Sequence, residues 1–473
     1  MAALLGLVLA SVVALAGCTS GGSAVKPEAG VADAAHSVEI PRSPVGSQVR
    51  WVHEMINADA DPSAGDIAAR LHEEFLAEVP AEEIVQLFAA SIRPARPFIA
   101  TSYEERDERT ARAVFAGAVG EPFALDLAVD ADGMITEMFL GQAGDEWQAS
   151  ASLAEVEQRI RAFDSDVRAL VLRESGAGET EVLSIGADEI APLGSMFKLY
   201  VLAAVAGEVA AGGLSWEDTL SLSEGDRSLP TGTLQDEPVG TAVTVLEAAT
   251  QMIAISDNTA TDLLMRTVGR DRVEQAVKEL RHGAPGVMRP MLTTREAFQL
   301  SYGGLSGAAD AAELRGLGEA WPTADEGERR SMLNRIGELP LTVTPTQASV
   351  AMSEMAEPPW TRDIEWYASP ADIASAHRQL AAMSQEQPEL VAILGTNSGL
   401  GPQFDSTERA GVAFKGGGNV GVLAGSWRVL ETDGTAVTVV LMFAGEDAAQ
   451  AAEIAQATPV LVGLASDIFR LVE

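Results

Sequence analysis

The chain has 473 residues, of which 47% are apolar, and its acidic residues outnumber the basic ones by 69 to 32, for a formal net charge of -37. This length suggests two domains, and the negative charge argues against nucleic acid as a partner, because phosphate backbones are repelled. The five histidines are scattered and one cysteine is present, which disfavours a zinc hydrolase and a disulfide framework. The composition thus implies no metal or organic cofactor and leaves the oligomeric state open.

The N-terminus has the pattern of a targeting segment. Residues 1–17 are mostly small and apolar, and they end in Leu15-Ala16-Gly17-Cys18. The stretch is too short for a lasting transmembrane helix and resembles a bacterial lipoprotein signal, which implies lipidation of Cys18. No Lys or Arg precedes the apolar run, and a plain secretory signal is the alternative. Residues 18–47 are rich in Gly, Ser, Pro and Ala and predict a flexible tether. We expect a secreted protein held by a lipid anchor at the outer face of the cell membrane.

Residues 48–146 predict a small α+β domain. Apolar residues recur at helical spacing from Gln48 to Ile92, with a new helix opening at Pro80. Alternating strands follow, the last two joined by a turn at residues 130–133. The predicted strands are Phe98 to Glu105, Thr110 to Ala118, Pro122 to Val129 and Met134 to Leu140. This element order resembles the cone-shaped nuclear-transport-factor-2 (NTF2)/steroid-isomerase fold, and no acid or base in it stands out as catalytic.

Residues 150–473 predict a second α+β domain, an antiparallel sheet flanked by helices plus a helical part. Its strands come from both ends of the segment, and helices dominate from Ser195 to about Leu380. A helix from Leu153 to Phe163 opens the domain and another begins at Glu446. The predicted strands are Arg168 to Arg173, Glu181 to Ile185, Ala410 to Lys415, Gly421 to Glu431 and Thr435 to Phe443.

The first candidate motif is Ser195-Met196-Phe197-Lys198, at the start of an apolar helix. A helix N-terminus favours negative charge, which helps an attacking alkoxide. Lys198 lies one turn after Ser195 and therefore on the same face. A lysine among apolar neighbours loses its proton more easily and can serve as the base.

Two further motifs follow. Ser256-Asp257-Asn258 lies on a predicted loop between helices, where a hydroxyl can relay a proton to a leaving nitrogen and an amide can hold the substrate. Lys415-Gly416-Gly417-Gly418 ends an apolar strand, where glycine lets a substrate pair with the backbone. The N–H of Gly418 with that of Ser195 would form an oxyanion hole, and Lys415 would attract a substrate carboxylate.

Together these motifs resemble Ser-x-x-Lys, Ser-Asp-Asn and Lys-Thr-Gly, the signature of serine β-lactamases and penicillin-binding proteins. Only four lysines occur in the chain, and two of them fall on motif positions. The resemblance covers residues 153 to 473 and implies catalytic roles for Ser195, Lys198, Ser256 and Lys415. It implies substrate binding by Asn258, Gly417 and Gly418, and Arg428, on the next predicted strand, is a further candidate for a substrate carboxylate.

The chain departs from that family at three points. Gly416 replaces the usual threonine of the third motif. No Asp or Glu lies between Glu279 and Glu296, where class A β-lactamases carry the glutamate that deacylates them. Glu296 fits a helix capping box better than a base, and an isolated histidine such as His282 is usually structural. We therefore expect acylation to be easier than deacylation.

The third departure is an extra segment near residues 302–370, which delays the third motif. Its aromatic residues either rim the active site or are buried in an added helical layer, and burial is the favoured interpretation. These residues are Trp321, Trp360, Trp366 and Tyr367. Such a segment, with a small N-terminal domain, resembles β-lactamase-like proteins of actinobacteria, including those linked to clavulanic acid clusters.

The sequence therefore predicts a serine hydrolase that forms an acyl-enzyme on Ser195 with a β-lactam, peptide or ester, and that turns β-lactams over weakly. β-Lactamase, D,D-peptidase and esterase activities all stay open, on a small-molecule or peptidoglycan-like substrate. The alternative is a cell-surface binding or sensing lipoprotein whose penicillin-binding site has degenerated. Covalent modification of Ser195 separates the two hypotheses.

Overall fold

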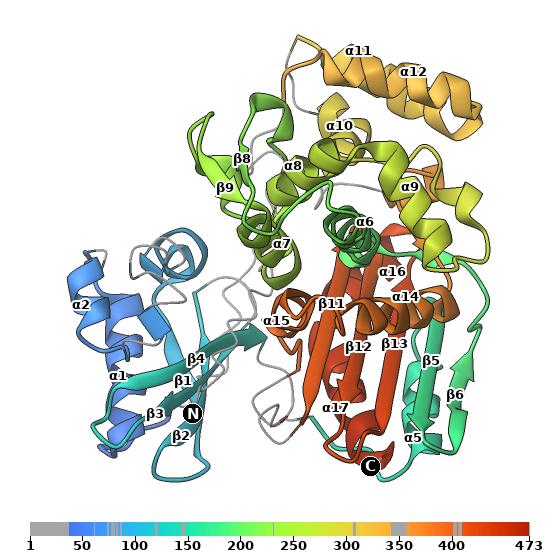
Figure 1. Ribbon diagram of the computed structural model, residues 1–473. Coiled ribbons are helices and arrows are strands. Elements are labelled where there is room, and N and C mark those ends of the chain that lie inside the picture. Colours follow the sequence, from blue (N-terminus) through green and yellow to red (C-terminus); the bar gives the residue numbers. More distant parts are fainter. Residues whose placement is uncertain are drawn as a thin grey trace, which may run out of the picture. The chain divides into compact units, whose positions relative to one another are not determined.

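The computed structural model describes residues 37–472, except 61, 73–74, 77–80, 82–83, 86–87, 119–121, 143–146, 230, 306–308, 342–356, 401–403 and 405–408. The predicted signal, Cys18, most of the tether and the helix start at Pro80 lie outside the described residues. The chain divides into two compact units between Trp147 and Gln148. Each is a mixture of helices and antiparallel sheet (Figure 1), as the predicted α+β class requires.

The first unit contains a four-stranded antiparallel meander in the order β1-β2-β3-β4. Its strands match the four predicted ones closely: β1 (Ile99–Glu105), β2 (Thr110–Ala116), β3 (Phe123–Val129) and β4 (Ile135–Gln142). Helix α1 (Pro44–Asn57) begins four residues before the predicted helical pattern, because the hydroxyl of Ser43 accepts from the N–H of Gly46 and caps it. Shorter pieces complete the unit: α2 (Ala64–Ala68), η1 (Phe88–Ile92) and η2 (Arg93–Ala95).

The core of this unit is formed by the apolar face of α1 and the inner face of the meander. Val49, Val52 and Ile56 are fully buried on the helix, at the spacing that predicted it. They share one cluster with Phe115 and Leu125 from the sheet. The likeness to the NTF2 fold stays a resemblance in element order.

The second unit is built on a five-stranded antiparallel sheet in the order β11-β12-β13-β5-β6. The strands come from the two ends of the segment, as predicted: β5 (Asp166–Ser175), β6 (Gly178–Ile185), β11 (Gly411–Asn419), β12 (Val422–Leu430) and β13 (Ala436–Ala444). β13 is buried along its whole length, because helices cover both faces of the sheet (Figure 1). α14 (Pro370–Met383) packs on one face, and α5 (Leu153–Ile160), α16 (Ala448–Ala455) and α17 (Thr458–Val472) belong to the other.

The helical part lies between β6 and β11 in the chain. It includes two short hairpin strands, β8 (Thr219–Ser221) and β9 (Ala242–Thr244), and two short paired strands, β7 (Ala191–Pro192) and β10 (Tyr367–Ala368). Its 3-10 turns are η3 (Gly194–Phe197), η4 (Glu224–Asp226), η5 (Leu234–Asp236), η6 (Pro285–Met288), η7 (Gly303–Leu305), η8 (Trp321–Thr323) and η9 (Pro359–Arg362). Besides α14, its described helices are α6 (Lys198–Ala210), α7 (Val245–Ala254), α8 (Asn258–Val268), α9 (Arg270–Glu279), α10 (Thr294–Tyr302), α11 (Ala311–Ala320), α12 (Glu326–Gly337) and α15 (Glu389–Gly395).

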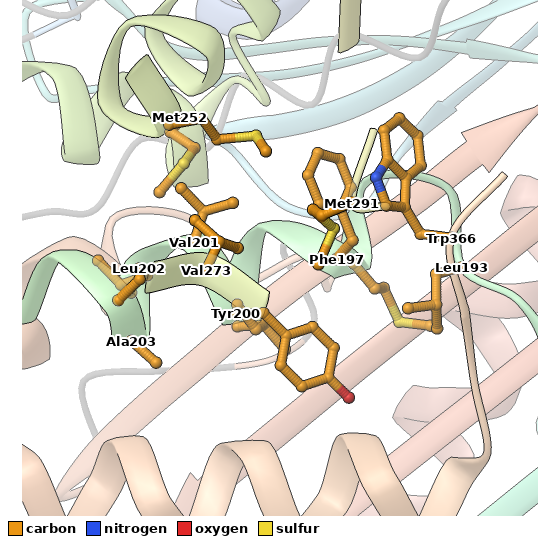
Figure 2. Packing of buried hydrophobic residues seen from close by; sticks show 14 of the residues in the cluster. Leu193, Phe197, Tyr200, Val201, Leu202, Ala203, Met252, Val273, Met291 and Trp366 are labelled. Carbon is orange, nitrogen blue, oxygen red and sulfur yellow. The ribbon is translucent and has the colours of Figure 1, made fainter. Parts of the chain in front are cut away.

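Helix α6 is the centre of the core, and its first nine residues are all buried. Figure 2 shows the packing around it, with Phe197 beside Trp366. Their rings stack at a centroid distance of 3.8 Å, and the indole N–H of Trp366 donates to the carbonyl of Leu292 at 3.0 Å. Trp321 is also buried. For these two tryptophans of the extra segment, burial is the correct interpretation, whereas Trp360 is only half-buried.

We expect Trp366→Ala to lower the free energy of unfolding of the second unit by about 3–5 kcal/mol, because it removes a buried indole and the stacking contact of that indole with Phe197. Urea unfolding followed by circular dichroism measures this loss. Trp360→Ala is the matched control, since that indole is half-buried and should cost less. Equal losses for the two variants would contradict the expectation.

Among the described residues, no single helix is long and apolar enough to cross a membrane, although α16 and α17 reach that length and composition when taken together across a bend of 59°.

Candidate active site

Ser195 lies in the tight turn η3, which runs directly into α6 at Lys198. The serine thus lies just ahead of the α-helix rather than on its first turn. Gly194 before it has φ of +50°, a left-handed conformation that favours glycine. A Cβ atom at Gly194 would lie 2.5 Å from the backbone nitrogen of Gly418. The turn that carries Ser195 is therefore in close contact with the third motif.

Lys198 is completely buried, and its Nζ makes three hydrogen bonds. It donates to the carbonyl of Ser256 at 2.5 Å and to Oδ1 of Asn258 at 2.7 Å, and it lies 2.9 Å from Oγ of Ser256. Burial and then the charge of Lys415 hold the pKa of Lys198 well below its usual range. A neutral amine donates two N–H groups to the two carbonyl-type oxygens and keeps a lone pair for a hydroxyl proton.

The backbone of Ser256 has a φ of 60°, a left-handed conformation that residues other than glycine rarely adopt and that costs about 1–3 kcal/mol. The neighbouring Asp257 fixes the loop, because its buried carboxylate accepts from the N–H groups of Thr233 at 2.8 Å and Ala260 at 2.7 Å. The hydroxyl of Thr231 donates to the carbonyl of Ser256 at 2.7 Å. The strain at Ser256 places its hydroxyl between two lysine amines.

The second of these amines belongs to Lys415 on β11, and this lysine is 3% exposed. Its Nζ lies 3.1 Å from Oγ of Ser256 and donates to the carbonyl of Gly416 at 2.9 Å. Burial lowers the pKa of Lys415 to about 7. The strand is fixed from behind, where Ser426 Oγ donates to the carbonyl of Lys415 at 3.0 Å and lies 3.0 Å from Nε2 of His377.

The glycines of the third motif lie inside β11, which continues to Asn419, so the predicted end of this strand at Lys415 was wrong. Pairing with β12 carries the backbone past the motif, from Lys415 opposite Ser426 to Asn419 opposite Val422. A Cβ at Gly417 would lie 2.0 Å from the carbonyl oxygen of Leu193. Gly417 is thus required for the close approach of β11 to the turn that carries Ser195.

Arg428 does not join this cluster. Its guanidinium forms an ion pair with Glu174 on β5 and donates to Oγ1 of Thr438 at 2.9 Å. Thr438 lies on β13, the next strand in the chain, whereas Glu174 lies on β5, far away in the sequence, and these two partners engage the guanidinium. The geometry offers no support for the predicted carboxylate-binding role.

The two loop residues considered as deacylation bases are both committed to structure. Glu296 completes the capping box of α10, accepting from the N–H of Thr293, and pairs with Arg270 at 2.6 Å. His282 is buried, where its Nδ1 accepts from the N–H of Ala284 at 3.0 Å, so its Nε2 donates to the carbonyl of Tyr367 at 2.9 Å. Both donor and acceptor roles of this imidazole are thereby occupied.

Two buried carboxyl groups near the motifs were missed by the sequence analysis. Asp262 accepts from the N–H groups of Thr294 and Arg295, each at 2.8 Å, and burial raises its pKa to about 7. Glu365 accepts from Nδ2 of Asn419 at 2.8 Å, and burial raises its pKa to about 7 as well, while the nearby N–H of Gly194, directly before the candidate nucleophile, lowers it. Acidic residues at helix positions or in an aromatic segment give no local signal of such a contact.

The arrangement provides a serine, a buried amine able to accept a proton, a bridging hydroxyl and a second amine near a glycine-rich edge strand. These are the parts that nucleophilic acyl transfer requires. Within the residues that the structure describes, no group of three or more His, Cys, Asp or Glu is placed to hold a metal ion.

Comparison with known structures finds similar proteins over about two thirds of the chain. A structure titled "Structure of PBP-A" is 16% identical, covering 68% of this chain and 99% of its own, with a TM-score of 0.42. A β-lactamase from Sphaerobacter thermophilus DSM 20745 is 19% identical, covering 68% of this chain and 98% of its own, with a TM-score of 0.41. No curated protein matches the chain.

Family models match both units. Residues 40–135 match the family described as "ORF 12 gene product N-terminal". Residues 153–458, well over half of the chain, match the family described as "Beta-lactamase enzyme family". The match spans Ser195, Lys198, Ser256 and Lys415. The chain therefore belongs to the β-lactamase enzyme family, within the serine β-lactamase superfamily.

Proposed function

We propose that this protein is a serine hydrolase that forms an acyl-enzyme through Ser195 on a β-lactam, peptide or ester, and that it releases β-lactam products slowly. The observation that carries the proposal is the hydroxyl of Ser256, 2.9 Å from the amine of Lys198 and 3.1 Å from that of Lys415. Burial lowers the pKa of both amines, so near neutral pH a neutral amine is available as a base.

In the proposed acylation, Ser195 Oγ attacks the substrate carbonyl carbon and its proton passes to the lone pair of Lys198. The N–H groups of Ser195 and Gly418 stabilise the oxyanion. The proton then reaches the leaving nitrogen or oxygen through the hydroxyl of Ser256, and the bond to the leaving group breaks. Lys415 attracts a substrate carboxylate while it is protonated, and Asn258 orients both Lys198 and the substrate.

Slow release follows from the positions of the remaining acids and bases. Glu296 and His282 are engaged in a capping box and in a buried pair of hydrogen bonds, so neither is free to activate water in the loop after the second motif. The intact cluster of Lys198, Ser256 and Lys415 argues against the alternative of a sensor that never reacts.

We further propose that the protein works at the outer face of the cell membrane, attached through lipidated Cys18, on a small-molecule or peptidoglycan-like substrate. The support is the sequence pattern of residues 1–47 alone. Labelling of cells with radioactive palmitate, with Cys18→Ala as the control, tests the anchor, and an unlabelled protein of native sequence would contradict it.

The experiment that tests the function is intact-mass spectrometry of residues 19–473 during incubation with benzylpenicillin and with a cephalosporin. We expect a persistent adduct of one β-lactam per protein, because acylation outruns deacylation. Fast and complete hydrolysis without an adduct would contradict slow release, although it would leave the serine hydrolase class intact. Absence of both adduct and product for β-lactams, esters and peptides would contradict the class itself.

We expect the acylation rate at saturating penicillin to rise with pH, because Lys198 acts as a base only when it is deprotonated. Binding of the anionic penicillin should weaken as pH rises through about 7, since Lys415 then loses its charge. Stopped-flow measurement of the rate and of the binding constant separates the two effects. A neutral ester is the matched control, because its rate should rise with pH while its binding stays constant.

A further inference from the structure

Glu365 is a buried carboxyl group that the proposed reaction does not use. It is 5% exposed and directly precedes Trp366, whose carbonyl accepts from the N–H of Leu193 at 2.8 Å. The segment before β10 therefore runs alongside the segment that leads to Ser195. No cation bonds to this carboxylate among the described residues; its partners are N–H groups.

The carboxylate accepts from two N–H groups, and a third N–H group from another segment lies near it. Oε1 accepts from the N–H of Trp366 at 3.0 Å, and Oε2 accepts from Nδ2 of Asn419 at 2.8 Å. The backbone N–H of Gly194 is close enough to lower the pKa of the carboxyl, although it makes a weaker contact than these two bonds. Asn419 is itself oriented, because its Oδ1 accepts from the hydroxyl of Tyr302 at 2.8 Å and from the N–H of Val420 at 2.9 Å.

Two of these donors flank the candidate oxyanion hole. Gly194 directly precedes Ser195, and Asn419 directly follows Gly418. The two segments approach so closely that a Cβ atom at Gly194 would lie 2.5 Å from the nitrogen of Gly418. One carboxylate thus joins the segment that supplies the first N–H group to the segment that supplies the second.

We propose that Glu365 is a positioning residue for acyl transfer, whose carboxylate joins Gly194 to Asn419 and so holds the N–H groups of Ser195 and Gly418 at the spacing that a substrate oxyanion needs. This inference rests on the proposed function of Ser195. Preorganised donors stabilise charge in the transition state at no further cost of reorientation, so the effect of Glu365 falls on the acylation step more than on substrate binding.

The ionised form of Glu365 suits this role and the protonated form does not. A carboxylate attracts all three N–H groups, whereas a protonated carboxyl adds a hydrogen-bond donor among groups that are themselves donors. Burial raises the pKa of Glu365 to about 7, against the opposing effect of these three N–H groups. The titratable and charged groups around it are Tyr302 on α10, Tyr367 on β10 and, beyond these, Arg362 and Asp363.

The test compares wild type with Glu365→Gln, which keeps the shape of the side chain but loses the charge and one acceptor. At pH 8 we expect acylation by penicillin to slow by about tenfold, in line with the loss of charge-assisted hydrogen bonds beside an oxyanion hole, while the binding constant changes less than about threefold. The ratio of the two acylation rates should approach 1 as pH falls below 6, because Glu365 is then protonated in wild type. Effects of Lys198 and Lys415 cancel in this ratio.

Glu274→Gln is the matched control. Glu274 is 6% exposed on α9 and accepts from Arg330 at 2.9 Å and from the N–H of Met291 at 3.1 Å, so it is equally buried but has no bond to the nucleophile turn or to β11. The acylation rate of Glu274→Gln should equal that of wild type at each pH. If Glu365→Gln does not fold, Asn419→Ala cuts the same connection from the other side and should slow acylation in the same sense.

Hydrogen exchange gives a readout that does not need acylation. Peptides covering residues 193–197 and 416–419 should both exchange faster in Glu365→Gln than in wild type at pH 8, with no change in Glu274→Gln. If wild type is never acylated, the proposed function fails, and exchange alone decides whether Glu365 joins the two segments. Unchanged exchange in both peptides, or an unchanged acylation rate at pH 8 in an acylated protein, would overturn the role of Glu365.

Discussion

Ser195→Ala is expected to abolish both the covalent β-lactam adduct and any hydrolysis of ester or lactam, with a fall in rate of at least about 10⁴-fold. The other nucleophile in the cluster, the amine of Lys198, cannot replace the serine, because it is buried and hydrogen-bonded to Ser256 and Asn258. Intact-mass spectrometry and spectrophotometric hydrolysis measure the two losses.

The variant should keep the fold, because Ser195 is half-buried in a turn that Gly194 and the stacked Phe197 hold in place. A melting temperature within a few degrees of wild type is the required control. Ser223→Ala is a matched serine substitution at the η4 turn, where the hydroxyl bonds only to Asp226 among its described partners, and it should leave the adduct unchanged. An adduct that persists in Ser195→Ala would move the nucleophile to another residue and refute the assignment.

The sequence predicted those parts of the site that depend on local patterns. Ser195 and Lys198 are three residues apart, and Ser256 lies between two helices, α7 and α8, as its sequence context predicted. The strands from both ends of the second unit were also predicted, because their apolar runs are bounded by turns. Local spacing is enough in such cases because neighbouring residues on one element cannot move apart.

The rest depends on register and on contacts between distant segments. Arg428 lies on a predicted strand, but only the pairing of β12 with β13 and of β13 with β5 brings it to Glu174. Glu365 is separated from Gly194 by most of the helical part, and the two residues come close because β10 pairs with β7. The sequence pattern of neither segment indicates which distant segment it pairs with, so the contact between Glu365 and Gly194 could not be predicted from a single sequence.

The electrostatics of the lysine pair also required the structure. The sequence indicates a base at Lys198 and an anion-binding amine at Lys415. It does not show that both amines lie within hydrogen-bond distance of the hydroxyl of Ser256. A hydroxyl has two lone pairs and one proton, so it can accept from both amines while they are charged, or donate to one of them once that amine is neutral. Shared use of Ser256 Oγ therefore links the protonation of Lys415 to the basicity of Lys198, consistent with the charge of Lys415 lowering the pKa of Lys198.

The second large effect is expected for Gly417→Ala, which should lower the acylation rate by about 100-fold or more, the effect of losing an oxyanion-hole donor. A Cβ at this position would lie 2.0 Å from the carbonyl oxygen of Leu193 and 3.1 Å from the nitrogen of Met196. These are backbone atoms of the nucleophile segment, so they cannot rotate away as a side chain does. β11 must therefore shift outward, and Gly418 moves away from Ser195.

Its neighbours in the same strand are the controls. A Cβ at Gly416 would meet the ring of Phe414 at 3.1 Å, and one at Gly418 would come no closer than 3.8 Å to the carbonyl of Val422. Gly416→Ala and Gly418→Ala should therefore stay within about threefold of the wild-type rate, because a side-chain ring can shift by a few tenths of an ångström at small cost. Stopped-flow acylation of the three variants ranks them directly. Equal losses would mean that strand flexibility matters rather than contact, whereas a loss confined to Gly417 ties the rate to the distance between β11 and the turn of Ser195.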